Sequence, residues 1–254
     1  MTLETFFREV PRAAVAFSGG TDSAFLLWAA KKQGCQIQAY YIHTAFQPRF
    51  ELEDARRLAG ELGIPMQVID MDILGVPEAA QNGPRRCYYC KRALFTRLRE
   101  QAAKDGYTVL LDGTNASDDA GDRPGMQALR ELRVRSPLRE CGITKDMVRS
   151  LSREAGLFTW EKPAYACLAT RVPTGTKITR EDLQRAEQAE MALMALGFQD
   201  FRVRLSGEGA RLQMTGDQMS LAVERRNDIM QALKPLFPAV FLDLEERSPS
   251  VQRR

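Results

Sequence analysis

Ala14-Val-Ala-Phe-Ser-Gly-Gly-Thr-Asp-Ser23 is the stretch that decides the fold, because a glycine-rich turn in it joins a buried strand to a helix. Small or apolar residues over 14–17 are typical of the end of such a strand, and the apolar run 24–30 predicts the helix. A turn of this kind directs unpaired backbone N–H groups to one point, at the positive end of the helix dipole. The stretch therefore predicts an anion site, and its small side chains would let a phosphate group come close.

The turn also carries hydroxyl donors and one carboxylate. Ser18, Thr21 and Ser23 add hydroxyl groups, and Asp22 could hold a magnesium ion (Mg²⁺) that bridges phosphates. The turn lacks the Gly-Lys-Ser/Thr of a Walker A loop and the third glycine of the dinucleotide fingerprint. With Gly19 and Gly20 it instead resembles the pyrophosphate loop, Ser-Gly-Gly-x-Asp-Ser, of ATP pyrophosphatases. The resemblance implies that ATP is split to AMP and pyrophosphate, with AMP left on a substrate oxygen.

The composition is that of an ordinary globular protein. Of its 254 residues 44% are apolar and 27% charged, which allows one large domain or two modest ones. No apolar run approaches the roughly 18 residues of a membrane span, and the start lacks the basic-then-apolar form of a signal peptide. We therefore expect a cytoplasmic protein without membrane contact. Five cysteines, an odd number, do not suggest a disulfide framework in that compartment.

The charge gives little support for a polyanionic partner, since the formal net charge is only +3, and we do not expect nucleic acid to bind. Arginines and acids are interspersed through most of the chain, as on solvated helix faces. One local group of cations is either such a helix face or a ligand site. It comprises Arg85, Arg86, Lys91, Arg92, Arg97 and Arg99.

Strand and helix patterns alternate through the first part of the chain, which indicates an α/β fold, a parallel sheet with helices on both faces. Ligands of such sheets lie beyond the carboxyl ends of the strands, where Ser18 and Gly113 both fall, and we place both in the ATP site. Strands are predicted over 36–43, 66–72 and 107–112, and helices over 50–62, 88–104 and 144–155.

An acidic, glycine-rich loop, 113–125, follows the strand predicted at 107–112. Such loops usually face solvent, but this one starts at the carboxyl end of a core strand, where a loop can bind substrate or Mg²⁺. Both interpretations stay open. The candidate ligands in it are Asp118, Asp119, Asp122 and Arg123.

The pattern changes near residues 173–175, where we place a boundary between a domain at 1–172 and a smaller one at 173–254. Thr179 and Asp182 predict the capped start of a helix that runs to Leu196. Alternating residues predict a hairpin over 201–206 and 210–214. A helix over 217–233 and a strand over 240–244 complete a small α+β module for substrate binding or oligomerisation.

Three cysteines are candidates for chemistry. Cys87-Tyr-Tyr-Cys90 lies at the start of a predicted helix, and Cys167 stands far downstream. The pair fits a redox dithiol, because a helix N-terminus lowers a thiol pKa. It also fits part of a structural zinc site or of an iron–sulfur cluster. An iron–sulfur cluster held by only three cysteines would leave one iron open to an exogenous sulfide. From the pair alone the three hypotheses stay open.

Several motifs together resemble the LarE family of ATP-dependent sulfur transferases, which build the nickel-pincer nucleotide cofactor of lactate racemase. The resemblance covers nearly the whole chain, and its later motifs are more specific than the pyrophosphate loop, which identifies only the superfamily. Its carriers are Ser18-Gly-Gly-Thr-Asp-Ser23, the Asp112-Gly-Thr-Asn loop, Tyr88-Tyr89 before a helix with Lys91, Asp122-Arg-Pro-Gly125, Cys167 through Arg171, Pro173-x-Gly175 and Arg202-Val-Arg204.

The resemblance implies adenylation of a carboxylate of a pyridinium dicarboxylate mononucleotide, followed by displacement of AMP by sulfur to give a thiocarboxylate. In one form of the family a lone cysteine at the position of Cys167 gives up its own sulfur. Other members have cysteines where Cys87 and Cys90 stand and resemble cluster-dependent thiolases. Because this chain has all three, we expect a [4Fe-4S] cluster that carries sulfide, with Cys167 as a ligand rather than a sacrificed residue. The expected cofactors are ATP, Mg²⁺ and this cluster.

The resemblance also implies a substrate site in the small domain. Arg202 and Arg204 alternate with Val203, so both leave one strand face and could hold the substrate phosphate. Glu190 in the preceding helix matches a family site position less firmly, and surface charge is the plain alternative for all three. We expect a small-molecule nucleotide substrate and a homo-oligomer. The alternatives are a cluster-dependent tRNA thiolase, an amide-forming synthetase and a non-catalytic nucleotide-binding protein with structural zinc.

Overall fold

The computed structural model describes residues 1–118 and 124–248. By its internal contacts the chain forms two compact units. The first contains Met1–Ala79 and Arg85–Lys162, and the second contains Ala80–Pro84 and the chain from Pro163 onward. The domain boundary predicted between residues 172 and 173 stays a prediction.

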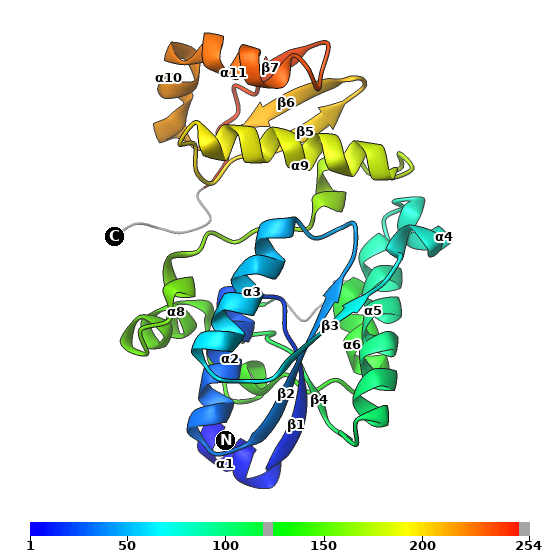
Figure 1. Ribbon diagram of the computed structural model, residues 1–254, viewed down its shortest axis with the longest axis vertical. Coiled ribbons are helices and arrows are strands. Elements are labelled where there is room, and N and C mark those ends of the chain that lie inside the picture. Colours follow the sequence, from blue (N-terminus) through cyan, green and yellow to red (C-terminus); the bar gives the residue numbers. More distant parts are fainter. Residues whose placement is uncertain (119–123, 249–254) are drawn as a thin grey trace. The chain divides into compact units, whose positions relative to one another are not determined.

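The first unit is built on a four-stranded sheet in the order β3-β2-β1-β4, in which every pair is parallel (Figure 1). The chain starts at β1, moves outward through β2 and β3, and then crosses back to place β4 on the other side of β1. This reversal is a topological switch point, beside which open α/β sheets bind their ligands. The strands are β1 Arg12–Ala16, β2 Gln36–His43, β3 Met66–Asp70 and β4 Leu110–Leu111.

Helices cover both faces of this sheet, as the sequence predicts (Figure 1). Successive side chains of β1 pack on opposite faces of the sheet, because side chains alternate along a strand. Ala13 and Val15 pack in the core shared with α1, α2, α3 and α8, whereas Ala14 packs in the core shared with α5. The helices of this unit are α1 Leu3–Glu9, α2 Thr21–Lys32, α3 Arg49–Glu61, α4 Pro77–Ala80, α5 Arg86–Lys104, α6 Pro124–Glu131, α7 Pro137–Glu140 and α8 Lys145–Glu154, with short 3₁₀ turns η1 Ile73–Gly75 and η2 Phe158–Glu161.

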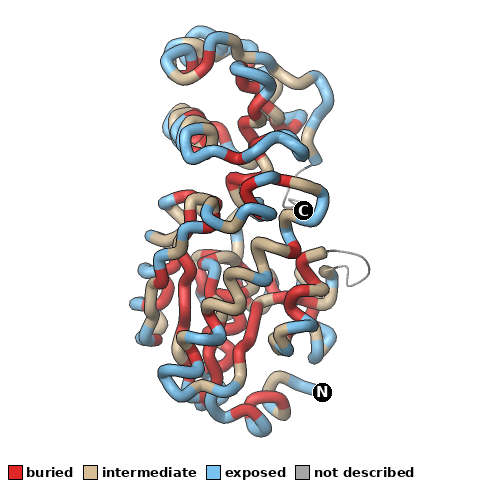
Figure 2. Tube along the Cα trace, turned by 90° about the vertical axis from the view of Figure 1, so that its right-hand side faces the viewer, coloured by how far each residue is buried: buried red, intermediate tan, exposed pale blue. Residues whose placement is uncertain are grey.

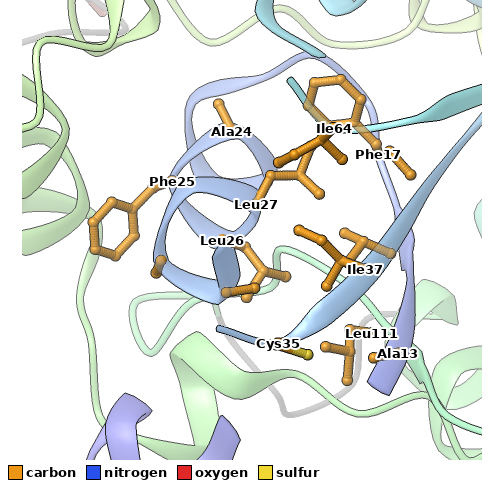
Figure 3. Packing of buried hydrophobic residues seen from close by; sticks show 14 of the residues in the cluster. Ala13, Phe17, Ala24, Phe25, Leu26, Leu27, Cys35, Ile37, Ile64 and Leu111 are labelled. Carbon is orange, nitrogen blue, oxygen red and sulfur yellow. The ribbon is translucent and has the colours of Figure 1, made fainter. Parts of the chain in front are cut away.

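Helix α2 is held by its apolar side chains. Leu26 and Leu27 are fully buried and point toward Ile37 of β2 (Figure 3). Figure 2 shows the buried residues of the described chain in red. Burying a leucine side chain stabilises the fold by roughly 1.5–3 kcal/mol. The packing of these side chains therefore holds α2 against the sheet, and with it the glycine-rich turn at its start.

Two predicted elements differ from the structure. The strand expected at 107–112 is paired with β1 only at Leu110 and Leu111. The N–H of Tyr107 instead closes the end of α5, donating to Ala102 O at 2.8 Å, and Asp112 has already turned toward Arg135. The single helix expected at 217–233 is divided at Arg225, whose guanidinium group bonds the carbonyl oxygen of Leu196 and the carboxylate of Asp228.

The second unit has a three-stranded sheet in the order β5-β6-β7, with β5 and β6 antiparallel and β7 parallel to β6. Helix α9 packs against β5 and α11. Its predicted cap is confirmed, since the Thr179 hydroxyl accepts from the N–H of Asp182 at 3.1 Å. The elements are η3 Leu168–Arg171, α9 Arg180–Ala195, β5 Arg202–Ser206, β6 Gly209–Gln213, α10 Gly216–Glu224, α11 Arg226–Leu233 and β7 Val240–Leu242.

Asn82 explains why residues 80–84 belong to the second unit. It is fully buried and has φ 57°, in the left-handed region that asparagine tolerates. Its side-chain Nδ2 lies 2.8 Å from Pro173 O and 3.1 Å from Thr176 O, and its own carbonyl accepts from the N–H of Gly175 at 2.9 Å. The Pro173-x-Gly175 motif thus forms a turn around one buried amide.

None of the helices in the described ranges combines the length and the apolar character needed to cross a bilayer.

Candidate functional site

The glycine-rich turn lies between β1 and α2. Gly19 has φ 74°, and a Cβ atom built there would lie 2.9 Å from Glu51 O, so a side chain is excluded both by conformation and by space. Among the described residues no side chain caps α2 at Gly20, and the amide groups of the first helical turn are left for a ligand or for water. This backbone arrangement is the one that the predicted anion site requires, and phosphate binding there stays a prediction.

The hydroxyl groups of the turn mostly support the turn itself. Ser18 Oγ lies 3.1 Å from Ser23 Oγ, which in turn donates to Gly20 O at 3.1 Å. Thr21 is 5% exposed, and its hydroxyl donates to Thr159 O at 2.8 Å. Its role toward a phosphate is thus left to its N–H group. The hydroxyl groups of Ser18 and Ser23 bond each other and also backbone groups of the turn, since Ser18 Oγ accepts from the N–H of Gly20 and Ser23 Oγ accepts from the N–H of Ser18.

Asp22 is held between an amide and an ammonium group. Its Oδ1 accepts from Asn115 Nδ2 at 3.2 Å, and its Oδ2 pairs with Lys145 Nζ at 2.5 Å. Lys145 is the first residue of α8, whose N-cap is Thr144. The sequence analysis named neither Asn115 nor Lys145 as a site residue. Asn115 stands in the Asp112-Gly-Thr-Asn motif and could have been found there, whereas no pattern around Lys145 marks it.

The loop after β4 packs directly on the glycine-rich turn. A Cβ atom at Gly113 would lie 2.8 Å from the N atom of Ser23, so only glycine allows this approach. Asp112 is 5% exposed and fixes the loop, accepting from the hydroxyls of Thr114 at 2.5 Å and Ser136 at 2.6 Å. The two loops that the sequence places in the ATP site are thus adjacent.

Of the acidic candidates in this loop, Asp118 serves the loop itself, since its Oδ2 accepts from the N–H of Asn115 at 3.0 Å. Asp119, Asp122 and Arg123 lie outside the described residues. The choice between a solvent-facing loop and a ligand loop therefore stays open for these three.

Further cations surround the turn. Lys162 Nζ lies 3.4 Å from Gly19 O and 2.6 Å from Asp54 Oδ2. Arg149 of α8 donates to Lys162 O at 3.0 Å, and burial lowers the pKa of its guanidinium group, although the nearby carboxylate of Asp22 opposes this. Together with Lys145 these side chains give the site a positive potential, which favours a polyphosphate.

Cys87 and Cys90 are the second and fifth residues of α5, three residues apart and so on one face of the helix. Cys87 is exposed and Cys90 half-buried, and Arg86 Nη2 lies 3.8 Å from Cys87 Sγ. Cys167 is half-buried and precedes η3 in the second unit. Within the described residues no three His, Cys, Asp or Glu side chains are grouped to hold a metal ion. The cluster with Cys87, Cys90 and Cys167 as ligands therefore stays a prediction.

Of the substrate residues expected in the second unit, Arg202 and Glu190 are buried and Arg204 is half-buried. Arg202 is 5% exposed, donates to Phe201 O at 2.6 Å and Ala164 O at 2.5 Å, and burial lowers its pKa to about 10. Arg204 donates to Gln213 Oε1 at 2.8 Å and to Thr170 O, and burial lowers its pKa also. Both arginines thus contact the segment that contains Cys167.

Glu190 is also buried, at 1% exposure. It forms an ion pair of 2.8 Å with Arg171, which is fully buried. The plain alternative of surface charge is therefore wrong for Arg202 and Glu190. Arg171 was named in the sequence only as the end of the Cys167 motif, and nothing in the pattern marked it as a partner of Glu190.

The chain is similar to known proteins over part or nearly all of its length. The family model described as queuosine biosynthesis protein QueC matches residues 12–80, the part that contains the glycine-rich turn. A protein of Synechocystis sp., described as uncharacterized, is 38% identical over 249 residues, covering 96% of this chain and 92% of the relative. The pyridinium-3,5-bisthiocarboxylic acid mononucleotide synthase of Lactiplantibacillus plantarum is 32% identical over 246 residues, covering 96% of this chain and 89% of the synthase.

A more distant similarity covers part of the chain. The tRNA-specific 2-thiouridylase MnmA of Pseudothermotoga lettingae is 25% identical over 187 residues, which are 59% of this chain and 54% of the relative. The two long matches extend over both units, whereas this one is confined to a little more than half of the chain.

Proposed function

The chain belongs to the LarE family, that of the pyridinium-3,5-bisthiocarboxylic acid mononucleotide synthase, and from this premise we propose that it converts a carboxylate of a pyridinium dicarboxylate mononucleotide to a thiocarboxylate with ATP. The observation that carries the proposal is the glycine-rich anion site at the switch point between β1 and β4, with Asp22 held by Asn115 and Lys145. An ATP-dependent sulfur transferase needs such a site to activate the carboxylate.

The first step is adenylation. A carboxylate oxygen of the substrate attacks the α-phosphorus of ATP, and the bond from that phosphorus to the bridging oxygen of pyrophosphate breaks. Pyrophosphate leaves with the electron pair. The backbone N–H groups at the start of α2 and the ammonium groups of Lys145 and Lys162 stabilise the negative charge that gathers on it.

The second step is sulfur transfer. A sulfur nucleophile attacks the carbonyl carbon of the acyl adenylate, a C–S bond forms, and the C–O bond to AMP breaks. AMP is a good leaving group because its phosphate carries the departing charge. We propose that Cys167 takes part in presenting this sulfur, since Arg202 and Arg204, the proposed binders of the substrate phosphate, contact the same segment. Asp122 and Arg123 remain proposed substrate contacts.

The donor sets fit the cofactors that the family implies. Mg²⁺ prefers carboxylate and hydroxyl oxygen, which Asp22, Ser18 and Ser23 provide at the anion site, and it would neutralise the phosphates there. Cysteine thiolates are the ligands of iron–sulfur clusters, and α5 presents two of them on one face. We propose that Cys87, Cys90 and Cys167 hold a [4Fe-4S] cluster. Held by these three cysteines, such a cluster would leave one iron without a protein ligand and would supply a binding position for sulfide.

Incubation of the full-length chain with ATP, Mg²⁺, sulfide and pyridinium dicarboxylate mononucleotide tests the proposal. We expect AMP, pyrophosphate and a product whose mass shows one oxygen replaced by sulfur. Asp22→Asn should abolish both products of ATP cleavage. Unmodified tRNA and ammonia with the same acid serve as competing substrates. Thiolation of tRNA, or the mass of an amide, would contradict the proposal.

A further inference from the structure

Arg171 and Glu190 form a buried ion pair that the proposed chemistry does not use. Arg171 is fully buried and Glu190 is 1% exposed. Two parallel hydrogen bonds join them, Nε to Oε1 at 2.8 Å and Nη2 to Oε2 at 3.0 Å. An apolar pair of similar volume often stabilises a core at least as well as a buried ion pair does, so stability alone is a weak reason for this one.

The carboxylate of Glu190 is saturated by protein donors. Besides the two bonds from Arg171, its Oε1 accepts from the N–H of Val203 at 2.9 Å, and its Oε2 accepts from the hydroxyl of Tyr165. Four donors occupy the roughly four lone-pair sites of a carboxylate. Glu190 therefore serves Arg171, Tyr165 and β5 in this structure, and a substrate contact would require breaking one of these bonds.

The remaining nitrogen of Arg171 reaches the backbone on both sides of Cys167. Its Nη1 lies 2.9 Å from Ala166 O and 3.5 Å from Cys167 O, the carbonyl oxygens before and after the Cα atom of Cys167. The same Nη1 donates to Thr170 Oγ1 at 2.8 Å, and this hydroxyl donates to Cys167 O at 2.9 Å. The two peptide planes that set the direction of the Cys167 side chain are thus held by one guanidinium group.

We propose that Arg171, oriented by Glu190, is a positioning residue that fixes the thiol of Cys167 for sulfur transfer. The inference rests on the proposed function, because that function gives Cys167 its part in handling sulfur. Burial alone would lower the pKa of Arg171, but the hydrogen bonds and charge of Glu190 raise it, so the guanidinium group keeps its charge and all its donors. The pair thereby links α9 and β5 to the backbone around Cys167.

Two variants separate positioning from plain stability. Arg171→Met leaves the Glu190 carboxylate buried and unpaired, and should lower the melting temperature strongly. The double variant Arg171→Met with Glu190→Gln removes that charge, and glutamine can still accept from Val203 and bond Tyr165, so the melting temperature should recover. Leu233→Ala is the matched control, because Leu233 is fully buried in α11 and its loss destabilises the same unit.

Two readouts on the full-length chain are needed. The first is the rate at which iodoacetamide alkylates Cys167 in the cluster-free protein, followed by peptide mass spectrometry. The second is sulfur transfer to the acyl adenylate. We expect both Arg171 variants to transfer sulfur about 10- to 100-fold more slowly, as a misplaced reacting group does, and to show an altered alkylation rate. Leu233→Ala should lower the melting temperature and leave both rates unchanged.

Recovery of both the melting temperature and sulfur transfer in the double variant would overturn the inference, because the pair would then act only through stability. The failure of the proposed function is a separate outcome. If Cys167→Ser transfers sulfur at the full rate, Cys167 has no part in the chemistry. The alkylation rates would still report whether Arg171 positions its thiol.

Discussion

The carboxylate of Asp22 pairs with Lys145 in this structure and is also the proposed ligand of Mg²⁺. Lys145 now holds Oδ2 at 2.5 Å, and a Mg²⁺ ion that bridges phosphates would need the same oxygen. We therefore expect the ammonium group of Lys145 to be displaced toward the phosphates when ATP and Mg²⁺ bind, where it would add to the charge that stabilises pyrophosphate. The ion pair keeps Lys145 beside the site before the nucleotide binds.

Lys145→Ala should slow AMP formation by about 100-fold, the scale on which a removed transition-state donor acts. The side chains of Lys145 and Asp22 are 30% and 24% exposed, so the free energy of unfolding should change by only about 0–1 kcal/mol. Chromatography of AMP and chemical denaturation measure the two effects. Lys31→Ala, at the far end of α2, is the control. An unchanged rate of AMP formation would contradict the role of Lys145.

Gly19→Ala should weaken ATP binding and destabilise the protein by about 1–3 kcal/mol, because alanine at φ 74° is strained and its Cβ atom would meet Glu51 O at 2.9 Å. Gly60→Ala inside α3 is the matched control. Apart from the neighbouring residues and the backbone of α3 itself, no heavy atom of the described residues lies within 4 Å of a Cβ atom at Gly60, so alanine should stabilise that helix by about 0.5–1 kcal/mol. Equal ATP affinity in both variants, measured by calorimetry, would show that the turn tolerates a side chain.

Helix α5 combines a partly buried body with an accessible first turn. Cys87 lies in that turn and is exposed, so it contributes little to packing. Its proposed role depends on its position at the start of the helix.

The other end of α5 explains why the strand predicted at 107–112 is shorter in the structure. Tyr107 still belongs to the turn that closes this helix. Apolar residues can be buried by packing without being paired in a sheet, and the sequence pattern cannot separate the two.

In the cluster-free protein, Cys87→Ala should leave the free energy of unfolding within about 0.5 kcal/mol of the cluster-free wild type, as exposed substitutions do. It should nevertheless abolish multiple turnover, because the proposed cluster, which would carry the sulfide for each turnover, would lose a ligand. Product formed per enzyme, with ATP and sulfide in excess, measures this. Cys141→Ala is the matched control, since Cys141 is half-buried and lies outside the proposed set of ligands. Full multiple turnover in Cys87→Ala would remove Cys87 from the proposed set of cluster ligands, whereas one product per enzyme in the wild type would return the sulfur chemistry to Cys167 alone.

The topology of the first unit explains which site residues the sequence could predict. The turn at Ser18 and the loop at Gly113 follow neighbouring strands, so their meeting follows from the alternation of strands and helices. Lys145 reaches the site from the start of α8, by a packing of helices that no local pattern encodes. The pairing of Arg171 with Glu190 likewise depends on how α9 packs against η3. Sequence patterns predicted the loops of the site, and tertiary packing supplied their charged partners.

The proposed cluster predicts the same loss of iron when any one of its three cysteine ligands is removed. Cys87 and Cys90 belong to the first unit and Cys167 to the second. Two thiolates on one helical turn hold iron poorly without a third, since iron–sulfur clusters normally take four cysteine ligands. Cys87→Ala, Cys90→Ala and Cys167→Ala should therefore each lose iron and acid-labile sulfide to the same extent after anaerobic purification. Cys35→Ala should retain both, because Cys35 is buried among apolar residues of the first core. Zinc without acid-labile sulfide in the wild type would replace the cluster with a structural metal, and loss confined to the Cys87 and Cys90 variants would remove Cys167 from the ligand set.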